Sequence, residues 1–167
     1  MYKKTISCII ALTCFTSTSF AQIDNKKQEQ YDNYIEEHYK KITMFNLIDK
    51  LNKKHNKNIV YLEPIELQVS YYTDLNCENG FGSINCKGKR LQDGMIANNI
   101  MELGTQIYIP ELGLKTVEDR GSKKYFDRID AIDVFVPRQF GETDRQYYKR
   151  VNNLGIHKAT GYIITEK

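Results

Sequence analysis

The spacing of apolar residues changes once along the chain, and this change constrains the fold more than any other feature. Between Gln28 and Lys54 apolar residues recur every three or four positions, which predicts an amphipathic α-helix. From Ile65 onward the apolar runs are short, and turns carrying Gly, Asn or Pro separate them. The pattern therefore predicts a helical segment at 22–64 followed by a mainly β domain at 65–167.

Five segments of the second part have the composition of strands: Leu67–Thr73, Gln106–Ile109, Leu114–Glu118, Ile132–Val136 and Thr160–Ile164. Between the last two, Thr143 and Gln146 have the spacing of a capping box, and Tyr147, Tyr148 and Val151 give the helix that begins there an apolar side. Short strands with few helices are typical of a small closed barrel or a sandwich. The earlier helix, at 28–54, either packs on this domain or serves as a spacer or dimerising helix.

Residues 1–21 have the pattern of a signal peptide. Lys3 and Lys4 precede the apolar run Ile6–Phe15, and Ser19 and Ala21 supply the small residues of a cleavage site. The run is shorter than the roughly 20 apolar residues that span a bilayer. We expect cleavage after Ala21 and export to the periplasm, the cell wall or the medium, with no stable membrane insertion. A lipid anchor through Cys14 is the alternative, although the residues before it fit a lipobox poorly.

Loss of this leader changes the charge and the cysteine content. The whole chain has 24 Lys and Arg, 21 Asp and Glu, and 4 Cys, and the leader removes two lysines and two cysteines, which leaves a net charge of +1. Such a balance argues against nucleic-acid binding. In an exported protein we expect the remaining Cys77 and Cys86 to form a disulfide, with free thiols as the alternative. Two cysteines and scattered histidines are too few for a metal site, so we expect no cofactor.

Acidic residues crowd the stretch 118–133, and two of them are placed for chemistry. Asp133 lies inside the most strand-like segment, on the face opposite Ile132 and Val134, and neighbouring apolar surface there raises the pKa of a carboxyl group. A carboxyl that keeps its proton near neutral pH can act as a general acid. Asp119 follows the strand at 114–118, where we expect it to face the same groove.

Short motifs follow one another in a particular order: Val69-Ser70-Tyr71-Tyr72-Thr73, Lys87-Gly88-Lys89-Arg90-Leu91, Ile96-Ala97-Asn98, Leu103-Gly104-Thr105-Gln106-Ile107-Tyr108-Ile109, Val117-Glu118-Asp119-Arg120-Gly121 and Ile132-Asp133-Val134-Phe135-Val136-Pro137. This series resembles the three-aspartate (3D) domain, a double-psi β-barrel related to the catalytic domain of membrane-bound lytic transglycosylase A. The resemblance covers roughly residues 67–164. It implies a six-stranded double-psi β-barrel, here preceded by the amphipathic helix, with an open groove that binds peptidoglycan glycan strands.

The resemblance also implies an activity. In the related lytic enzymes an aspartate protonates the oxygen between N-acetylmuramic acid and N-acetylglucosamine, and then acts as base on the muramic 6-hydroxyl. An anhydro ring forms without attack by water. By position, Asp133 is the expected acid/base and Asp119 the aspartate that orients it or stabilises the transition state, while Asp130 competes with Asp133 for the family position. Segments that line the family groove supply four candidate substrate contacts: Tyr72, Thr73, Lys89 and Gly121.

Two departures from the family pattern bear on function. Asn98-Asn99 stand where the family often has an aspartate, and Arg120 follows Asp119, where we expect it to keep that acid ionised. The leading prediction is an exported peptidoglycan-cleaving enzyme of lytic transglycosylase type. The alternatives are a non-catalytic glycan-binding module, which localises a partner through the 28–54 helix or associates with itself, and a secreted effector or inhibitor.

Overall fold

A computed structural model of the chain divides it into two compact units, at residues 1–53 and 54–167. The structure describes the backbone from Lys3 to Lys167 and the side chains from Asn25 onward. Most of the helix α1 (Lys3–His55) forms the first unit. The predicted signal peptide lies outside the residues whose side chains are described.

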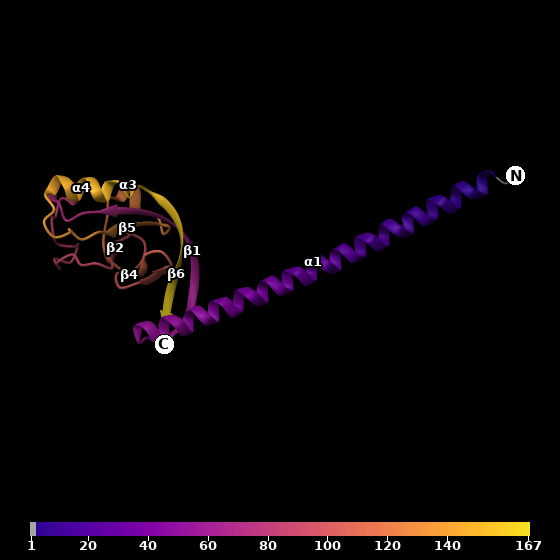
Figure 1. Cartoon of the computed structure of the whole chain (residues 1–167), viewed down its shortest axis with the longest axis horizontal. Helices are drawn as coiled ribbons and strands as arrows, with labels where there is room; N and C mark the ends of the chain where they lie inside the picture. Colours follow the sequence, from indigo (N-terminus) through magenta and orange to yellow (C-terminus); the bar gives the residue numbers. More distant parts are fainter. Residues whose placement is uncertain (1–2) are drawn as a thin grey trace. The chain divides into compact units, whose positions relative to one another are not determined.

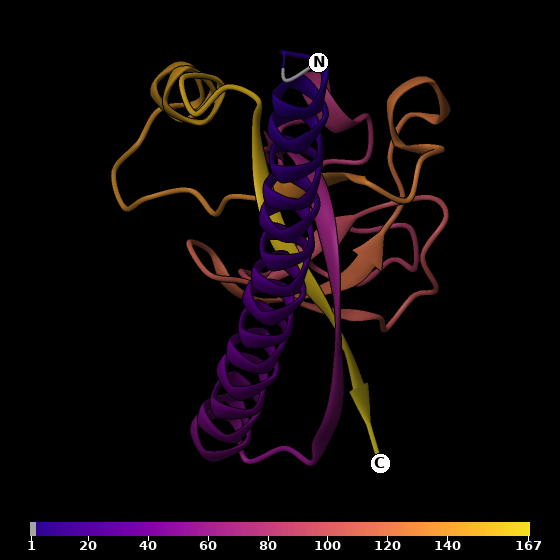
Figure 2. The same ribbon diagram turned by 90° about the vertical axis from the view of Figure 1, so that its right-hand side faces the viewer.

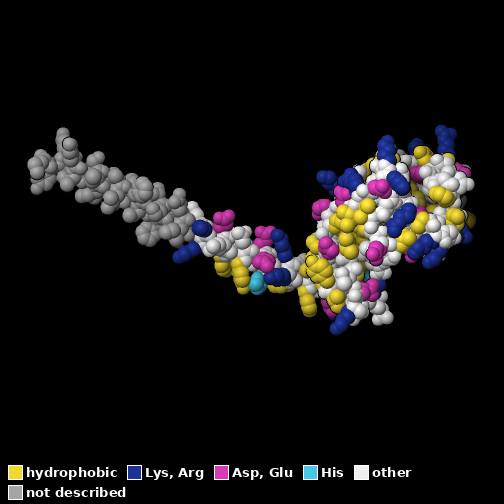
Figure 3. All heavy atoms as spheres, turned by 180° about the vertical axis from the view of Figure 1, so that it is seen from behind, with side chains coloured by type: hydrophobic (Ala, Val, Ile, Leu, Met, Phe, Trp, Pro, Cys, Tyr) yellow, Lys and Arg dark blue, Asp and Glu magenta, His cyan; other side chains and the backbone are white. Residues whose placement is uncertain are grey.

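The described part of α1 carries the predicted apolar stripe. Figure 3 shows hydrophobic side chains along one side of it, and its large exposed hydrophobic residues are Tyr31, Tyr34, Tyr39, Ile42 and Phe45. Ion pairs four residues apart, such as Glu36–Lys40, support the helix locally. The helix ends at His55, followed by Asn56 with a left-handed φ of 51°. No helix among the described residues is both long and apolar enough to cross a membrane.

The second unit contains a closed barrel of six strands. They are β1 (Ile59–Tyr72), β2 (Met95–Ala97), β3 (Gln106–Ile109), β4 (Gly113–Asp119), β5 (Ala131–Phe135) and β6 (His157–Glu166). Their order around the barrel is β1-β5-β2-β4-β3-β6. The pairs β1–β5 and β2–β4 are parallel and the others antiparallel, and Figure 2 shows β1 and β6 running side by side. The predicted fold class, a six-stranded double-psi barrel preceded by a helix, is confirmed in its closure, its strand number and the preceding helix.

The strands differ from their sequence-based bounds in two places. All five predicted strands are present, but β1 begins at Ile59, inside the segment predicted as helical, because residues 59–69 pair with the long C-terminal strand β6. β2 was not predicted, since it is only three residues long. It nevertheless lies between β5 and β4 in the barrel, and so separates the strands that carry the two candidate acids.

Alternation along β5 directs its side chains to two different places. Ile132 and Val134 are 0% and 3% exposed and belong to the central core of the barrel, as predicted. Phe135 points the other way, and it packs in a second cluster with Tyr72, Leu91, Met95 and Ala97. Asp133 lies on the side of β5 that belongs to this second cluster, at the edge of the apolar core rather than within it.

Three short helices complete the second unit: α2 (Asn76–Asn79), α3 (Lys123–Phe126) and α4 (Asp144–Asn152). The capping box at the start of α4 is confirmed, because the backbone and side chains of Thr143 and Gln146 bond reciprocally. Tyr147 and Val151 are buried, whereas Tyr148, predicted on the same apolar side, is 46% exposed. α3 and α4 lie at one end of the barrel (Figure 1), and α3 contributes to the pocket described next.

Candidate functional site

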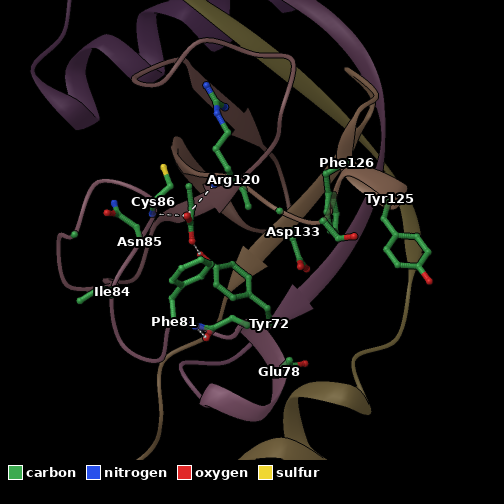
Figure 4. Close-up of a pocket in the computed structure, with 16 residues that line it drawn as sticks. Tyr72, Glu78, Phe81, Ile84, Asn85, Cys86, Arg120, Tyr125, Phe126 and Asp133 are labelled. Carbon is green, nitrogen blue, oxygen red and sulfur yellow. Dashed lines mark hydrogen bonds between the residues drawn. The ribbon is translucent and has the colours of Figure 1, made fainter.

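A pocket of about 840 Å³ opens beside the ends of β1, β2, β4 and β5. One of its walls is the loop after Tyr72, and the opposite wall comes from the segment 120–126 (Figure 4). Its lining includes both predicted aspartates, one further acid, one cation and several aromatic side chains: Asp119, Asp133, Glu78, Arg120, Tyr72, Phe81, Tyr125 and Phe126. The barrel therefore brings Asp119 and Asp133 into one pocket, as predicted.

Ala97 on β2 determines how the two aspartates are spaced. It pairs with Asp133 on one side and with Asp119 on the other. Two strand spacings therefore separate the two aspartates, about 10 Å between Cα atoms. Ala97 itself is 3% exposed and lines the pocket. Because its side chain is only a methyl group, the space between the two acids stays open.

Asp133 has the surroundings of a proton-retaining carboxyl group. Burial is the main cause that raises its pKa to about 6, and the charges of Glu78 and Asp119 add to the effect. Ser70, its register partner on β1, opposes the shift by donating a hydrogen bond of 2.8 Å from Oγ to Oδ1. In the described part of the chain no group bonds to Oδ2. That oxygen is thus free to carry a proton toward a ligand.

Asp119 has a different environment, because three donors hold it. The Tyr72 hydroxyl donates to Oδ2 at 3.0 Å, and the backbone N–H groups of Cys86 and Arg120 donate to Oδ1 at 2.8 Å each. Burial raises the pKa of Tyr72 far above its ordinary value, so this hydroxyl remains a donor. An ionised carboxylate has acceptors only and can accept all three bonds. The two acids therefore differ in what surrounds them: Asp133 keeps an unbonded oxygen, whereas both oxygens of Asp119 are engaged.

The guanidinium of Arg120 does not pair with Asp119 as expected. It bonds instead to the backbone carbonyls of Asn98 and Met101, and only the backbone N–H of Arg120 contacts the acid. The prediction that the Arg120 guanidinium lies next to Asp119 and acts on its charge is therefore wrong. Arg120 ties the loop after β4 to the turn after β2.

The hydrogen bonds of Asn98 explain why this position carries an amide side chain and not a carboxylate. The side chain is fully buried, and its Nδ2 donates to the carbonyls of Arg128 and Ala131 at 2.8 and 2.7 Å. Its Oδ1 accepts from the N–H groups of Ile100 and Met101. A carboxylate has no donor for the two carbonyls, so an aspartate would leave them opposed by negative charge. Asn98 is thus an anchor of the loop connections around the site.

Glu78 is a third carboxylate at the pocket that sequence reasoning missed. It lies on α2 and accepts hydrogen bonds from the backbone N–H and the hydroxyl of Thr73. Thr73, predicted to touch substrate, is fully buried, does not line the pocket and instead holds Glu78 in place. The only signal in the sequence for this arrangement was that Thr73 and Glu78 are five positions apart. Ser70 was also missed as a partner of Asp133, because parallel pairing across 63 positions leaves no local pattern.

The other predicted contacts divide into two groups. Tyr72 and Gly121 line the pocket, and a Cβ on Gly121 would overlap the ring of Phe126, so any larger residue here would displace that ring. Lys89 is exposed and outside the pocket. Asp130 also lies outside it, paired with Arg128 at 2.6 Å. Of the two aspartates that competed for the acid/base position, the structure places only Asp133 in the pocket.

The structure does not contain the predicted disulfide. Cys77 and Cys86 are both free thiols, and both residues are exposed. Cys77 lies in α2, while the Cys86 sulfur is 3.7 Å from the Glu118 carbonyl oxygen. Although Cys86 as a whole residue is exposed, partial burial of its thiol, followed by the charge of Asp119, raises the thiol pKa, which disfavours a nucleophilic thiolate. Among the residues described, no cluster of three or more His, Cys, Asp or Glu side chains could hold a metal ion.

No known family model matches the chain, and no curated protein is significantly similar to it. The function is therefore inferred from the pocket and from the sequence resemblance described above.

Proposed function

We propose that the protein cleaves peptidoglycan glycan strands by a lytic transglycosylase-type reaction in which Asp133 is the acid/base. One observation carries this proposal: a carboxyl group whose pKa is raised to about 6 stands, with one free oxygen, in a pocket of about 840 Å³. A general acid needs a proton near neutral pH and access to the leaving oxygen, and Asp133 has both. The pocket volume is in the range of sites that bind small molecules.

The reaction that the family resemblance implies needs only one such group. The proton on Asp133 Oδ2 passes to the oxygen that joins N-acetylmuramic acid to N-acetylglucosamine. The bond between that oxygen and C1 of the muramyl residue breaks, and its electron pair leaves with the glucosamine. The Asp133 carboxylate then takes the proton of the muramyl 6-hydroxyl, whose oxygen bonds to C1. Asp133 is protonated again at the end, and no water is consumed.

Asp119 supports this reaction as a fixed negative charge. Positive charge develops at C1 and the ring oxygen in an oxocarbenium-like transition state, and a preorganised carboxylate stabilises it. The three hydrogen bonds that Asp119 accepts hold it in place without neutralising it. Exposed rings on opposite walls, Phe81 at 75% and Tyr125 at 57% exposure, are suited to pack against sugar faces.

The proposal includes export of the protein, because the peptidoglycan substrate lies outside the cytoplasmic membrane. The positive charges, the apolar run and the small residues that end at Ala21 also support export. Export to the periplasm or the wall would bring the groove to peptidoglycan, and a protein released into the medium would reach it from outside the cell.

The nature of the products tests the proposal. We expect protein lacking the leader, incubated with purified sacculi, to release muropeptides that carry 1,6-anhydro ends, identified by mass spectrometry. The Asp133→Asn variant should lose about 10²- to 10⁴-fold in rate, the usual contribution of a general acid. Asp130→Asn, three residues upstream but outside the pocket, should stay within a few fold of wild type. Sacculus binding without bond cleavage would indicate the non-catalytic glycan-binding module, and reducing-end products would indicate hydrolysis by water.

A further inference from the structure

A second hollow adjoins the pocket and meets it at Asp133. It has a volume of about 440 Å³ and is lined from β1, α3, β5 and the end of α4. Three residues line both hollows: Tyr125, Phe126 and Asp133. Figure 4 shows Asp133 with Tyr72 on one side and Phe126 and Tyr125 on the other. A ligand bound at Asp133 therefore has two directions in which to extend.

The two hollows carry opposite charge. The larger one contains the carboxylates of Glu78 and Asp119, and the single cation among the described residues that line it, Arg120, is engaged with backbone carbonyls. The smaller one contains Lys124 and Arg128, and Asp133, which it shares with the larger one, is the only acid in its described lining. An anionic group thus meets repulsion in the first hollow and attraction in the second.

Lys124 is the cation of the second hollow that is available to a ligand. Its ammonium group lies 4.9 Å from the centre of the Tyr125 ring, and it pairs with no carboxylate among the described side chains. Arg128, in contrast, forms two hydrogen bonds to Asp130, at 3.0 and 2.6 Å. The preceding residue, Lys123, is also exposed and lines neither hollow.

We infer that the second hollow binds the acidic substituent of the sugar that reacts. The inference rests on the proposed function: the muramyl ring lies at Asp133, and its O3 substituent, a lactyl group extended by a peptide with free carboxylates, reaches past Asp133 toward Lys124. The sugar chain itself occupies the larger hollow, where its neutral hydroxyl and acetamido groups meet carboxylates and aromatic rings. The charge difference between the hollows thereby orients the substrate and selects a carboxylate-bearing glycan over a neutral one.

Binding measurements with two matched ligands test this inference. The ligands are a tetrasaccharide of peptidoglycan with peptide stems whose carboxyl groups are free, and the same tetrasaccharide with these groups amidated. Titration calorimetry uses the full mature chain with Asp133→Asn to prevent turnover. We expect the acidic ligand to bind about three- to fivefold more tightly, the size of one exposed ion pair. The preference should shrink in high salt.

Substitutions on α3 identify the cation responsible. Lys124→Gln should abolish the preference for the acidic ligand and leave the affinity for the amidated one unchanged, and Lys124→Arg should retain the preference. Lys123→Gln, the matched neighbour, should behave as the parent. Equal affinity of the parent for both ligands, or an equal effect of Lys123→Gln and Lys124→Gln, would overturn the inference while leaving the proposed function intact. Failure of the parent to bind either ligand would contradict the proposed function as well.

Discussion

Ser70 and Asp133 show how a single hydrogen bond adjusts an acid. The Ser70 hydroxyl lowers the pKa of Asp133, while burial raises it to about 6. Removing the hydroxyl leaves the burial effect unopposed, so the acid form persists to higher pH. Ser70→Ala should therefore shift the alkaline limb of the kcat/KM profile for glycan cleavage upward by about one pH unit or less. Ser83→Ala, an exposed serine outside the pocket, is the control. A downward shift would contradict this role.

The same carboxyl group has a cost in stability. With a folded pKa of about 6 and an unfolded pKa near 3.9, Asp133 binds protons more tightly in the native state. Its contribution is favourable below about pH 4 and is lost as the pH rises to 6. At pH 8, Asp133→Asn should therefore unfold at a higher urea concentration than wild type, with a free energy of unfolding larger by at most about 3 kcal/mol. Near pH 4 the two proteins should have the same stability. Asp130→Asn, which lies outside the pocket and forms an ion pair with Arg128, should not be stabilised at pH 8. Equal stability of Asp133→Asn and wild type at pH 8 would refute the assigned pKa.

The sequence predicted the positions of the two aspartates better than it predicted the residues that contact them. The alternation around Ile132 and Val134 placed Asp133 correctly, because β-strand periodicity is a local property. Ser70 and Glu78 could not be found this way, since their contacts depend on strand register and on a loop. Lys89 was predicted to line the groove, but it lies outside the pocket because Asn85 bonds to its backbone and closes a tight turn.

β2 is the element on which the site depends most. It is three residues long, and Ala97 at its end separates the two acids with the smallest available side chain that keeps a Cβ. Ala97→Leu should fill the space between the acids and lower kcat/KM by about 100-fold or more, the effect of a small misplacement of reacting groups. Because Ala97 is 3% exposed and packs in the second cluster, the leucine variant should also lose about 1–3 kcal/mol in its free energy of unfolding, so circular dichroism must show that it is folded, whereas Ala97→Ser should remain active. Wild-type kinetics for the leucine variant would exclude this position from the substrate site.

Elements of different length were predictable to different degrees. β3 and the capping box of α4 were predicted well, because turn residues and capping residues mark their ends. The first half of β1 was missed, because Pro64 and the glutamates around it obscure the alternation, and its pairing with β6 is a long-range contact. β2 is too short to show any period at all.

The whole barrel depends on closure by its last strand. β6 pairs with β1 over residues 157–166 and also with β3, so it completes the ring of hydrogen bonds. Without it, two strand edges are exposed, and such edges promote aggregation. A chain that ends at Gly155 should aggregate or stay unfolded, as judged by size-exclusion chromatography and circular dichroism. A soluble monomer with a cooperative thermal transition would show that the open sheet is sufficient.

The central claim is that Asp133 acts as the proton donor in glycan cleavage, and the pH dependence of product release tests it most directly. Initial rates of release of anhydro-muropeptides should be measured between pH 4 and 8 at limiting substrate. We predict that the rate falls about tenfold per pH unit above a pKa near 6, with no comparable release by Asp133→Asn. A rate that stays constant up to pH 8, or anhydro products released by Asp133→Asn at the wild-type rate, would contradict the account.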